Sequence, residues 1–114
     1  MASTPEGRFK QKVKKKLVLM FPGCYLHEMK CGDQGIPDTL ILYKNKWALL
    51  EFKESETAKR RPNQKYYVDL FDNMGFSSFI YPENETDVLK QLSLYFGGDP
   101  NGLFEDRLQR RRST

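Results

Sequence analysis

Two short apolar runs separated by a short polar segment constrain the fold of this chain more than any other feature. Residues 39–43 and 47–52 are rich in β-branched, aromatic and other apolar side chains, and Lys44 and Asn45 lie between them. Runs of this length and composition, joined by so short a connection, are typical of a β-hairpin. The sequence therefore predicts a pair of antiparallel strands here.

The rest of the chain divides into helices and strands by its hydrophobic period. Phe9, Val13, Leu17 and Met20 recur at steps of four, four and three, which predicts a helix with one apolar stripe, ended by Pro22-Gly23. The other expected elements are a strand at 25–29, a helix from a cap at Asn63 to about residue 74, a strand at 76–81 and a helix at 85–96. This order predicts an α/β fold, with a mixed central sheet flanked by helices.

Length and charge limit the class of protein. The chain has 114 residues, so we expect one domain over residues 1–100 and a basic tail over 101–114. A net charge of +4 fits a polyanionic partner, and nucleic acid is the first candidate. Cys24 and Cys31 form no C-x-x-C pair, and no apolar run is long enough to span a membrane. These features favour a cytoplasmic protein without a membrane partner.

A set of charged side chains borders the predicted hairpin. Asp38 precedes its first strand, while Glu51 and Lys53 lie two residues apart at the end of its second strand and so share a face. Phosphodiester hydrolysis needs a metal that binds phosphate oxygens, an activated water and stabilisation of the leaving oxyanion. Carboxylates select Mg²⁺ or Mn²⁺, and a nearby lysine can position the water. The alternative is a turn aspartate beside an ordinary surface ion pair.

The hairpin register tests this hypothesis. If Tyr43 pairs with Lys46 across the two-residue turn, Asp38 lies directly opposite Glu51. Directly opposed side chains have Cβ atoms roughly 4.5–5.5 Å apart, which suits one metal ion held between two carboxylates. A slip of one residue would send one carboxylate to the other face of the sheet.

These motifs resemble those of a known nuclease group. The matching segments are Gly35-Ile36-Pro37-Asp38, Glu51-Phe52-Lys53 and Asn63-Gln64. They are similar to the PD-(D/E)XK nuclease superfamily, and within it to the virus-type replication-repair nuclease (VRR-NUC) domain, over roughly residues 6–81. The resemblance implies a restriction-endonuclease-like αβββαβ core. It also implies that Asp38, Glu51 and the backbone carbonyl of Phe52 bind the metal, and that Lys53 positions or activates the water.

Two further site residues are suggested by the same resemblance. Family members often carry an acidic residue on the first helix, and Glu6 leads the apolar stripe here, so it is a candidate metal ligand. The alternative is a helix-start glutamate favoured by the helix dipole. Gln64 matches the glutamine that opens the helix after the lysine strand and is a candidate catalytic residue. Its alternative is a surface residue at a helix start.

Basic residues outside this set are candidates for contacts with DNA phosphates. They are Lys10 and Lys14 on the first helix, and Lys59, Arg60 and Arg61 in the charged segment before the second helix. A solvated loop is an equally good interpretation of the last three.

Together these features predict a Mg²⁺-dependent, structure-specific endodeoxyribonuclease of phage or viral replication and repair, with Mn²⁺ as a substitute and no small-molecule cofactor. A chain of this size supplies one carboxylate set, so we expect a homodimer that resolves four-way (Holliday) DNA junctions. The candidate dimer surfaces are Leu103, Phe104 and Leu108, with part of the first helix. The alternatives are a nicking, flap or exonucleolytic nuclease, and a catalytically silent DNA-binding module.

Overall fold

The computed structural model describes residues 4–30 and 35–97, and these contain three helices and four strands. In chain order they are α1 (Pro5–Met20), β1 (Tyr25–Glu28), β2 (Thr39–Tyr43), β3 (Lys46–Phe52), α2 (Gln64–Met74), β4 (Ser77–Ile80) and α3 (Glu85–Tyr95). The predicted order is confirmed, and every predicted boundary lies within one residue of the observed one. The predicted tail, with Leu103, Phe104 and Leu108, lies outside the described residues.

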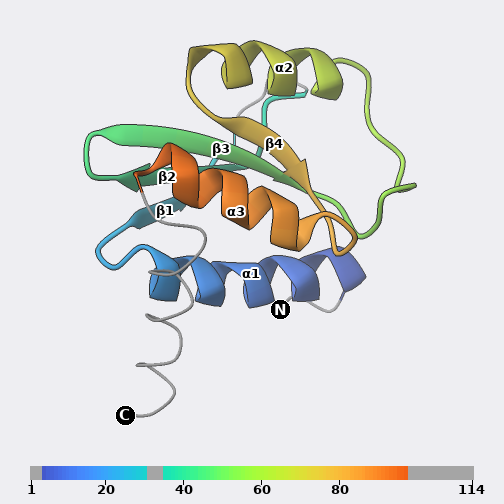
Figure 1. Cartoon of the computed structure of the whole chain (residues 1–114). Coiled ribbons are helices and arrows are strands. Elements are labelled where there is room, and N and C mark those ends of the chain that lie inside the picture. The colour runs from blue at the N-terminus through green and yellow to red at the C-terminus, as the bar shows by residue number, and fades with distance from the viewer. Residues whose placement is uncertain (1–3, 31–34, 98–114) are drawn as a thin grey trace.

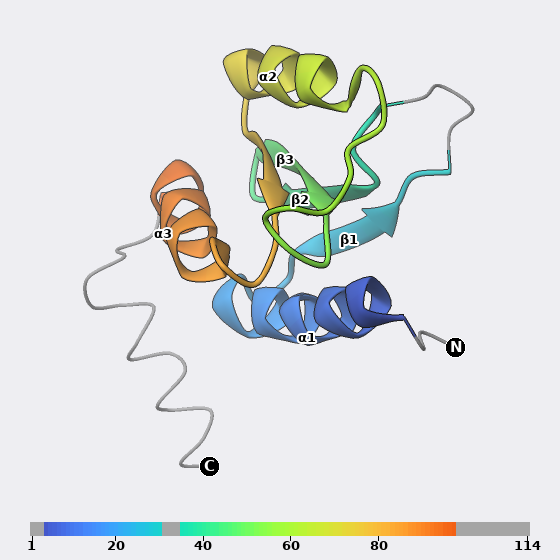
Figure 2. The ribbon, with the colours of Figure 1, turned by 90° about the vertical axis from the view of Figure 1, so that its right-hand side faces the viewer.

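The strands form one mixed sheet in the order β1-β2-β3-β4. β1, β2 and β3 are antiparallel neighbours, and β4 is parallel to β3, to which α2 makes the crossover. Figures 1 and 2 show α2 on one face of the sheet and α1 and α3 on the other. The expected mixed sheet flanked by helices is confirmed. None of the helices described is long and apolar enough to cross a membrane.

The main core lies between the sheet and the α1/α3 layer. The stripe of α1 is buried as its period predicts, and the Phe9 ring packs edge-on against Phe52 at 5.9 Å. Ile41, Leu50 and Phe52 are fully buried on this face of the hairpin. Because strand residues alternate in direction, the neighbours of Phe52 in sequence, Glu51 and Lys53, belong to the other face, which α2 covers.

The hairpin register agrees with the sequence prediction. Tyr43 pairs with Lys46 and Thr39 with Leu50, and Lys44 in the turn takes a positive φ of 57°. One step beyond the Thr39–Leu50 pair, the same register puts Asp38 opposite Glu51. The sheet therefore brings the two carboxylates to one place.

The start of α2 differs from the prediction. Asn63 has a left-handed φ of 75° and its side chain makes no capping hydrogen bond. Instead, the side-chain carbonyl of Gln64 accepts the backbone N–H of Arg61 at 2.8 Å. The backbone of Gly35 approaches so closely that a Cβ there would lie 2.8 Å from the Asn63 carbonyl carbon. The close approach of Gly35 accompanies this conformation of Asn63, and helix-cap preference does not account for it.

Candidate active site

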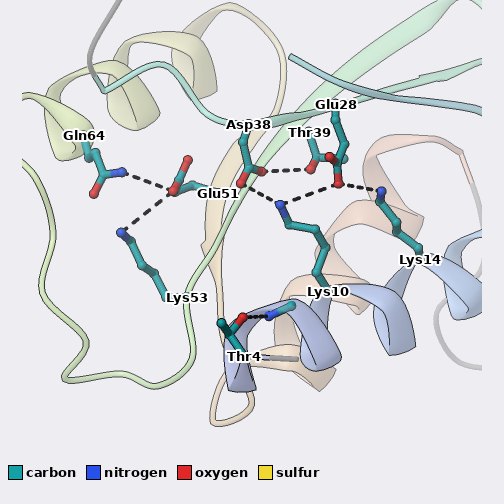
Figure 3. A network of polar contacts seen from close by, with 10 residues as sticks. Thr4, Lys10, Lys14, Glu28, Asp38, Thr39, Glu51, Lys53 and Gln64 are labelled. Carbon is teal, nitrogen blue, oxygen red and sulfur yellow. Dashed lines mark hydrogen bonds and ion pairs between the residues drawn. The ribbon is translucent and has the colours of Figure 1, made fainter. Parts of the chain in front are cut away.

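The candidate catalytic residues gather where the central strands end. Asp38 lies directly before β2, Glu51 is the penultimate residue of β3, and Lys53 follows β3. The backbone N–H of Lys53 donates to Ile80 of β4 at 3.0 Å, which fixes the chain where the site begins. Glu51 is 5% and Lys53 7% exposed, so both charged groups are buried. Figure 3 shows them beside Asp38 and Gln64.

The Glu51 carboxylate has two neighbours that hold it. Gln64 Nε2 donates to Oε2 at 3.1 Å, and the Lys53 ammonium lies 3.8 Å from the same oxygen. Burial, followed by the nearby charge of Asp38, raises the pKa of Glu51 from 4.5 to about 7, with a smaller contribution from Glu6. Lys53 opposes this rise but does not cancel it. Two carboxylates therefore repel each other here, and a divalent cation would relieve that repulsion.

Asp38 is held by a different pair of donors. The Lys10 ammonium of α1 lies 2.9 Å from Oδ2, and the Thr39 hydroxyl donates to Oδ1 at 2.8 Å. The backbone carbonyl of Asp38 accepts the N–H of Met29 at 2.7 Å, which ties its main chain to the segment after β1. The Asp38 side chain is 29% exposed and so remains open to solvent.

Gln64 lies beside Glu51, and its predicted catalytic role stays a prediction. The side chain is fully buried, with its amide nitrogen on Glu51 and its amide oxygen on the Arg61 N–H. Both polar ends of the amide are thus used within the protein. Through these two bonds Gln64 connects Glu51 to the loop before α2.

The donor set suits Mg²⁺ better than a metal that needs a full protein cage. Among residues 4–30 and 35–97, no three acidic, histidine or cysteine side chains are grouped closely enough to hold an ion alone. Mg²⁺ is commonly bound by one or two carboxylates and completes its shell with waters and substrate phosphates. Asp38 and Glu51 with the Phe52 carbonyl fit that pattern. Glu6 is near enough to influence Glu51, and its role as a direct ligand stays a prediction.

The residues predicted to bind DNA phosphates differ in their exposure and in their partners within the protein. Lys59 and Arg61 are exposed near the site. Arg60 stacks on Phe79, 4.5 Å from the ring centroid, and donates to the carbonyl oxygens of residues 56 and 58. Lys14 is paired with Glu28 at 2.7 Å, and Lys10 reaches into the site itself. Their roles in DNA binding stay predictions.

Sequence reasoning missed the contacts of Lys10 and Thr39 with Asp38, and that of Glu28 with Lys10. A signal existed, because Lys10 follows Glu6 by four residues and therefore shares its helix face. Glu28 pairs with Thr39 across β1 and β2, so it also lies beside the site. Neither fact could be used without knowing how α1 crosses the sheet.

Comparison with known proteins agrees with this geometry. A solved structure described as a VRR_NUC domain is similar to this chain, with a TM-score of 0.58 at 25% sequence identity, covering 69% of this chain and 85% of that one. No family model matches the sequence, and no curated protein matches it either. The structural likeness confirms the resemblance to VRR-NUC domains and the restriction-endonuclease-like fold, and it supports a nuclease domain.

Proposed function

We propose that this chain is a Mg²⁺-dependent endodeoxyribonuclease that hydrolyses DNA phosphodiesters. The observation that carries the proposal is the hairpin register, which puts Asp38 opposite Glu51, with the Lys53 ammonium 3.8 Å from the Glu51 carboxylate. Two carboxylates that can hold a metal ion, with a lysine that can orient a water, suit metal-assisted phosphodiester hydrolysis. The similarity to a VRR_NUC domain supports the same class.

Each residue then has a distinct task. Asp38, Glu51 and the Phe52 carbonyl hold Mg²⁺, for which Mn²⁺ can substitute. The chemistry that the ion supplies when bound is polarisation of the phosphate oxygens and a lowered pKa of water. Lys53 is anchored by Glu51 and by the Lys59 carbonyl at 3.3 Å, so its ammonium is positioned to orient a water and balance phosphate charge. Gln64 keeps Glu51 in its rotamer.

DNA contacts outside this centre would come from exposed cations. Lys59 and Arg61 are exposed on the loop between Lys53 and α2, and the Lys59 carbonyl accepts a hydrogen bond from the Lys53 ammonium. Contacts of this kind are electrostatic, so binding should weaken steeply with salt. They would position the DNA backbone without reading its sequence.

We further propose that the chain forms a homodimer that resolves four-way DNA junctions. Separating a junction takes two cuts on opposed strands, and a two-fold dimer presents the same site twice. An apolar surface suited to such a contact is a groove under α2 lined by Leu42, Trp47, Phe71 and Met74. Leu42 is 42% and Met74 64% exposed, which is unusual for large apolar side chains on one patch.

The test is cleavage of matched four-way, flap, nicked and linear DNAs with Mg²⁺, Mn²⁺ or EDTA, combined with light scattering. We expect a dimer that cuts the junction, and loss of turnover in Asp38→Asn, Glu51→Gln and Lys53→Ala. Asp69→Asn, a surface carboxylate of α2 paired with Lys65, is the matched control. Preference for ends, nicks or flaps would favour the second nuclease class. Binding without metal-dependent cleavage would leave the silent DNA-binding module.

A further inference from the structure

Lys10 stands out because its charge is inside the proposed metal site and not on the surface. It belongs to α1, yet its ammonium lies 2.9 Å from Asp38 Oδ2. Its side chain is 15% exposed and passes over the Phe52 ring, with the nitrogen 5.6 Å from the ring centroid. The Lys10 ammonium and a divalent ion would therefore compete for the Asp38 carboxylate.

A second acceptor lies within reach of the same ammonium. Glu28 Oε1 at the end of β1 is 3.6 Å from Lys10 Nζ, and the Glu28 side chain is 40% exposed. Lys14 Nζ binds this oxygen too, at 2.7 Å. Lysine carries its charge on four rotatable methylenes, so a small rotation takes the ammonium from Asp38 to Glu28 without moving α1. Lys10 thus has one acceptor inside the proposed metal site and one beside it.

We propose that Lys10 is a tethered cation that competes with the divalent metal for Asp38 and transfers to Glu28 when the metal binds. The inference rests on the proposed function, since it takes Asp38 as a metal ligand. It gives Lys10 and Glu28 roles that the nuclease motif does not contain. Lys10 sets the affinity of the site for metal, and Glu28 receives the displaced charge.

The geometry predicts the sign of each effect. Removing the ammonium leaves Asp38 free of its competitor and removes a like charge close to the metal, so binding should tighten, on the order of tenfold. Removing the Glu28 charge deprives Lys10 of its second acceptor, so binding should weaken. A Lys10 that only orients Asp38 for the metal would give the opposite sign for the first change, because loss of an orienting partner typically weakens metal affinity.

Calorimetric titration of the full chain with Mn²⁺, without DNA, tests the proposal. The variants are Lys10→Gln, Lys10→Met, Glu28→Gln and the double variant Lys10→Gln/Glu28→Gln. The methionine variant keeps the packing on Phe52, and circular dichroism reports whether each variant folds. Lys12→Gln is the matched control, because Lys12 lies on the same helix but faces Glu85 at 3.6 Å.

We expect tighter binding in both Lys10 variants, weaker binding in Glu28→Gln, and no further effect of Glu28→Gln once Lys10 is replaced. That last result distinguishes movement of the Lys10 ammonium to Glu28 from a general effect of removing a negative charge. In the general case, the effects of the two substitutions on the free energy of Mn²⁺ binding would be additive. The proposal is overturned if the folded Lys10 variants bind Mn²⁺ with unchanged or weaker affinity. It is also overturned if the double variant shows the sum of the two single effects on Mn²⁺ affinity. Asp38→Asn tests the proposed metal site separately. If the wild type does not bind Mn²⁺, or if Asp38→Asn binds it as tightly as the wild type, the proposed metal site itself fails.

Discussion

Replacing Glu51 with glutamine should stabilise the protein while it abolishes turnover. The Glu51 carboxylate is buried against Gln64 and beside the charge of Asp38, and its pKa is raised from 4.5 to about 7. Glutamine has nearly the same shape and can still accept the hydrogen bond from Gln64. The substitution therefore removes a buried charge and leaves the packing almost unchanged.

The size of the effect follows from the pKa. Between about pH 4.5 and 7 the folded protein holds a proton on Glu51 that the unfolded chain has released, so the stability that Glu51 contributes is complete below 4.5 and is lost as the pH rises to about 7. A rise from 4.5 to about 7 corresponds to about 3 kcal/mol at 1.36 kcal/mol per pKa unit. For a domain of this size that is a rise in Tm of roughly 10–20 °C at pH 8.

The assay is thermal and urea unfolding of the wild type and Glu51→Gln at pH 5 and pH 8, in EDTA. The difference in the free energy of unfolding between the two proteins should be large at pH 8 and small at pH 5. Saturating Mn²⁺ should reduce this difference at pH 8, because it stabilises the wild type. Equal stability of the two proteins at pH 8 would show that burial and the charge of Asp38 do not destabilise the ionised Glu51 carboxylate.

Three further predictions concern the surroundings of the site. Gln64→Ala should lower kcat about 10–100-fold with the fold intact, because Glu51 loses its orienting donor, and single-turnover kinetics would measure this. Gly35→Ala should cost about 1–3 kcal/mol in urea unfolding, since Gly35 has φ +96° and a close backbone neighbour; Gly23→Ala, with φ +88° but open space, should cost less. Leu42→Glu should convert a dimer to a monomer in light scattering, whereas Leu94→Glu, equally apolar and exposed on α3, should not.

The parts of the structure that the sequence predicts are those set by local rules. The stripe of α1 and the two-residue turn fix the helix and the hairpin register, and the register alone brings Asp38 opposite Glu51. The start of α2 was predicted incorrectly in its detail, because contact between Gly35 and Asn63 comes from chain segments far apart in sequence. Periodicity reports which face of an element is buried, and it is silent on such contacts.

The contact between Lys10 and Asp38 could not be predicted from the sequence for the same reason. Helical spacing places Lys10 beside Phe9 and on the face of Glu6, but the partner of its ammonium depends on the angle at which α1 crosses the sheet. Its interpretation as a phosphate-binding residue followed from charge alone, which cannot distinguish a cation that faces DNA from one that faces a carboxylate. The structure brings it to Asp38, and the proposed competition with metal depends on that contact.

The charges around the site suggest how metal loading and DNA binding could reinforce each other. When Glu51 is ionised, the charges of Asp38 and Glu51 are balanced by the Lys10 and Lys53 ammoniums, so these four groups are neutral together. A divalent ion shared by the two carboxylates makes the site positive, and transfer of Lys10 to Glu28 moves one of those charges away from Asp38 while keeping it near the site. A phosphate would then meet an excess of positive charge only where metal is bound. Mn²⁺ should therefore bind more tightly in the presence of an uncleaved phosphorothioate DNA than without it, because coupling between two ligands is reciprocal.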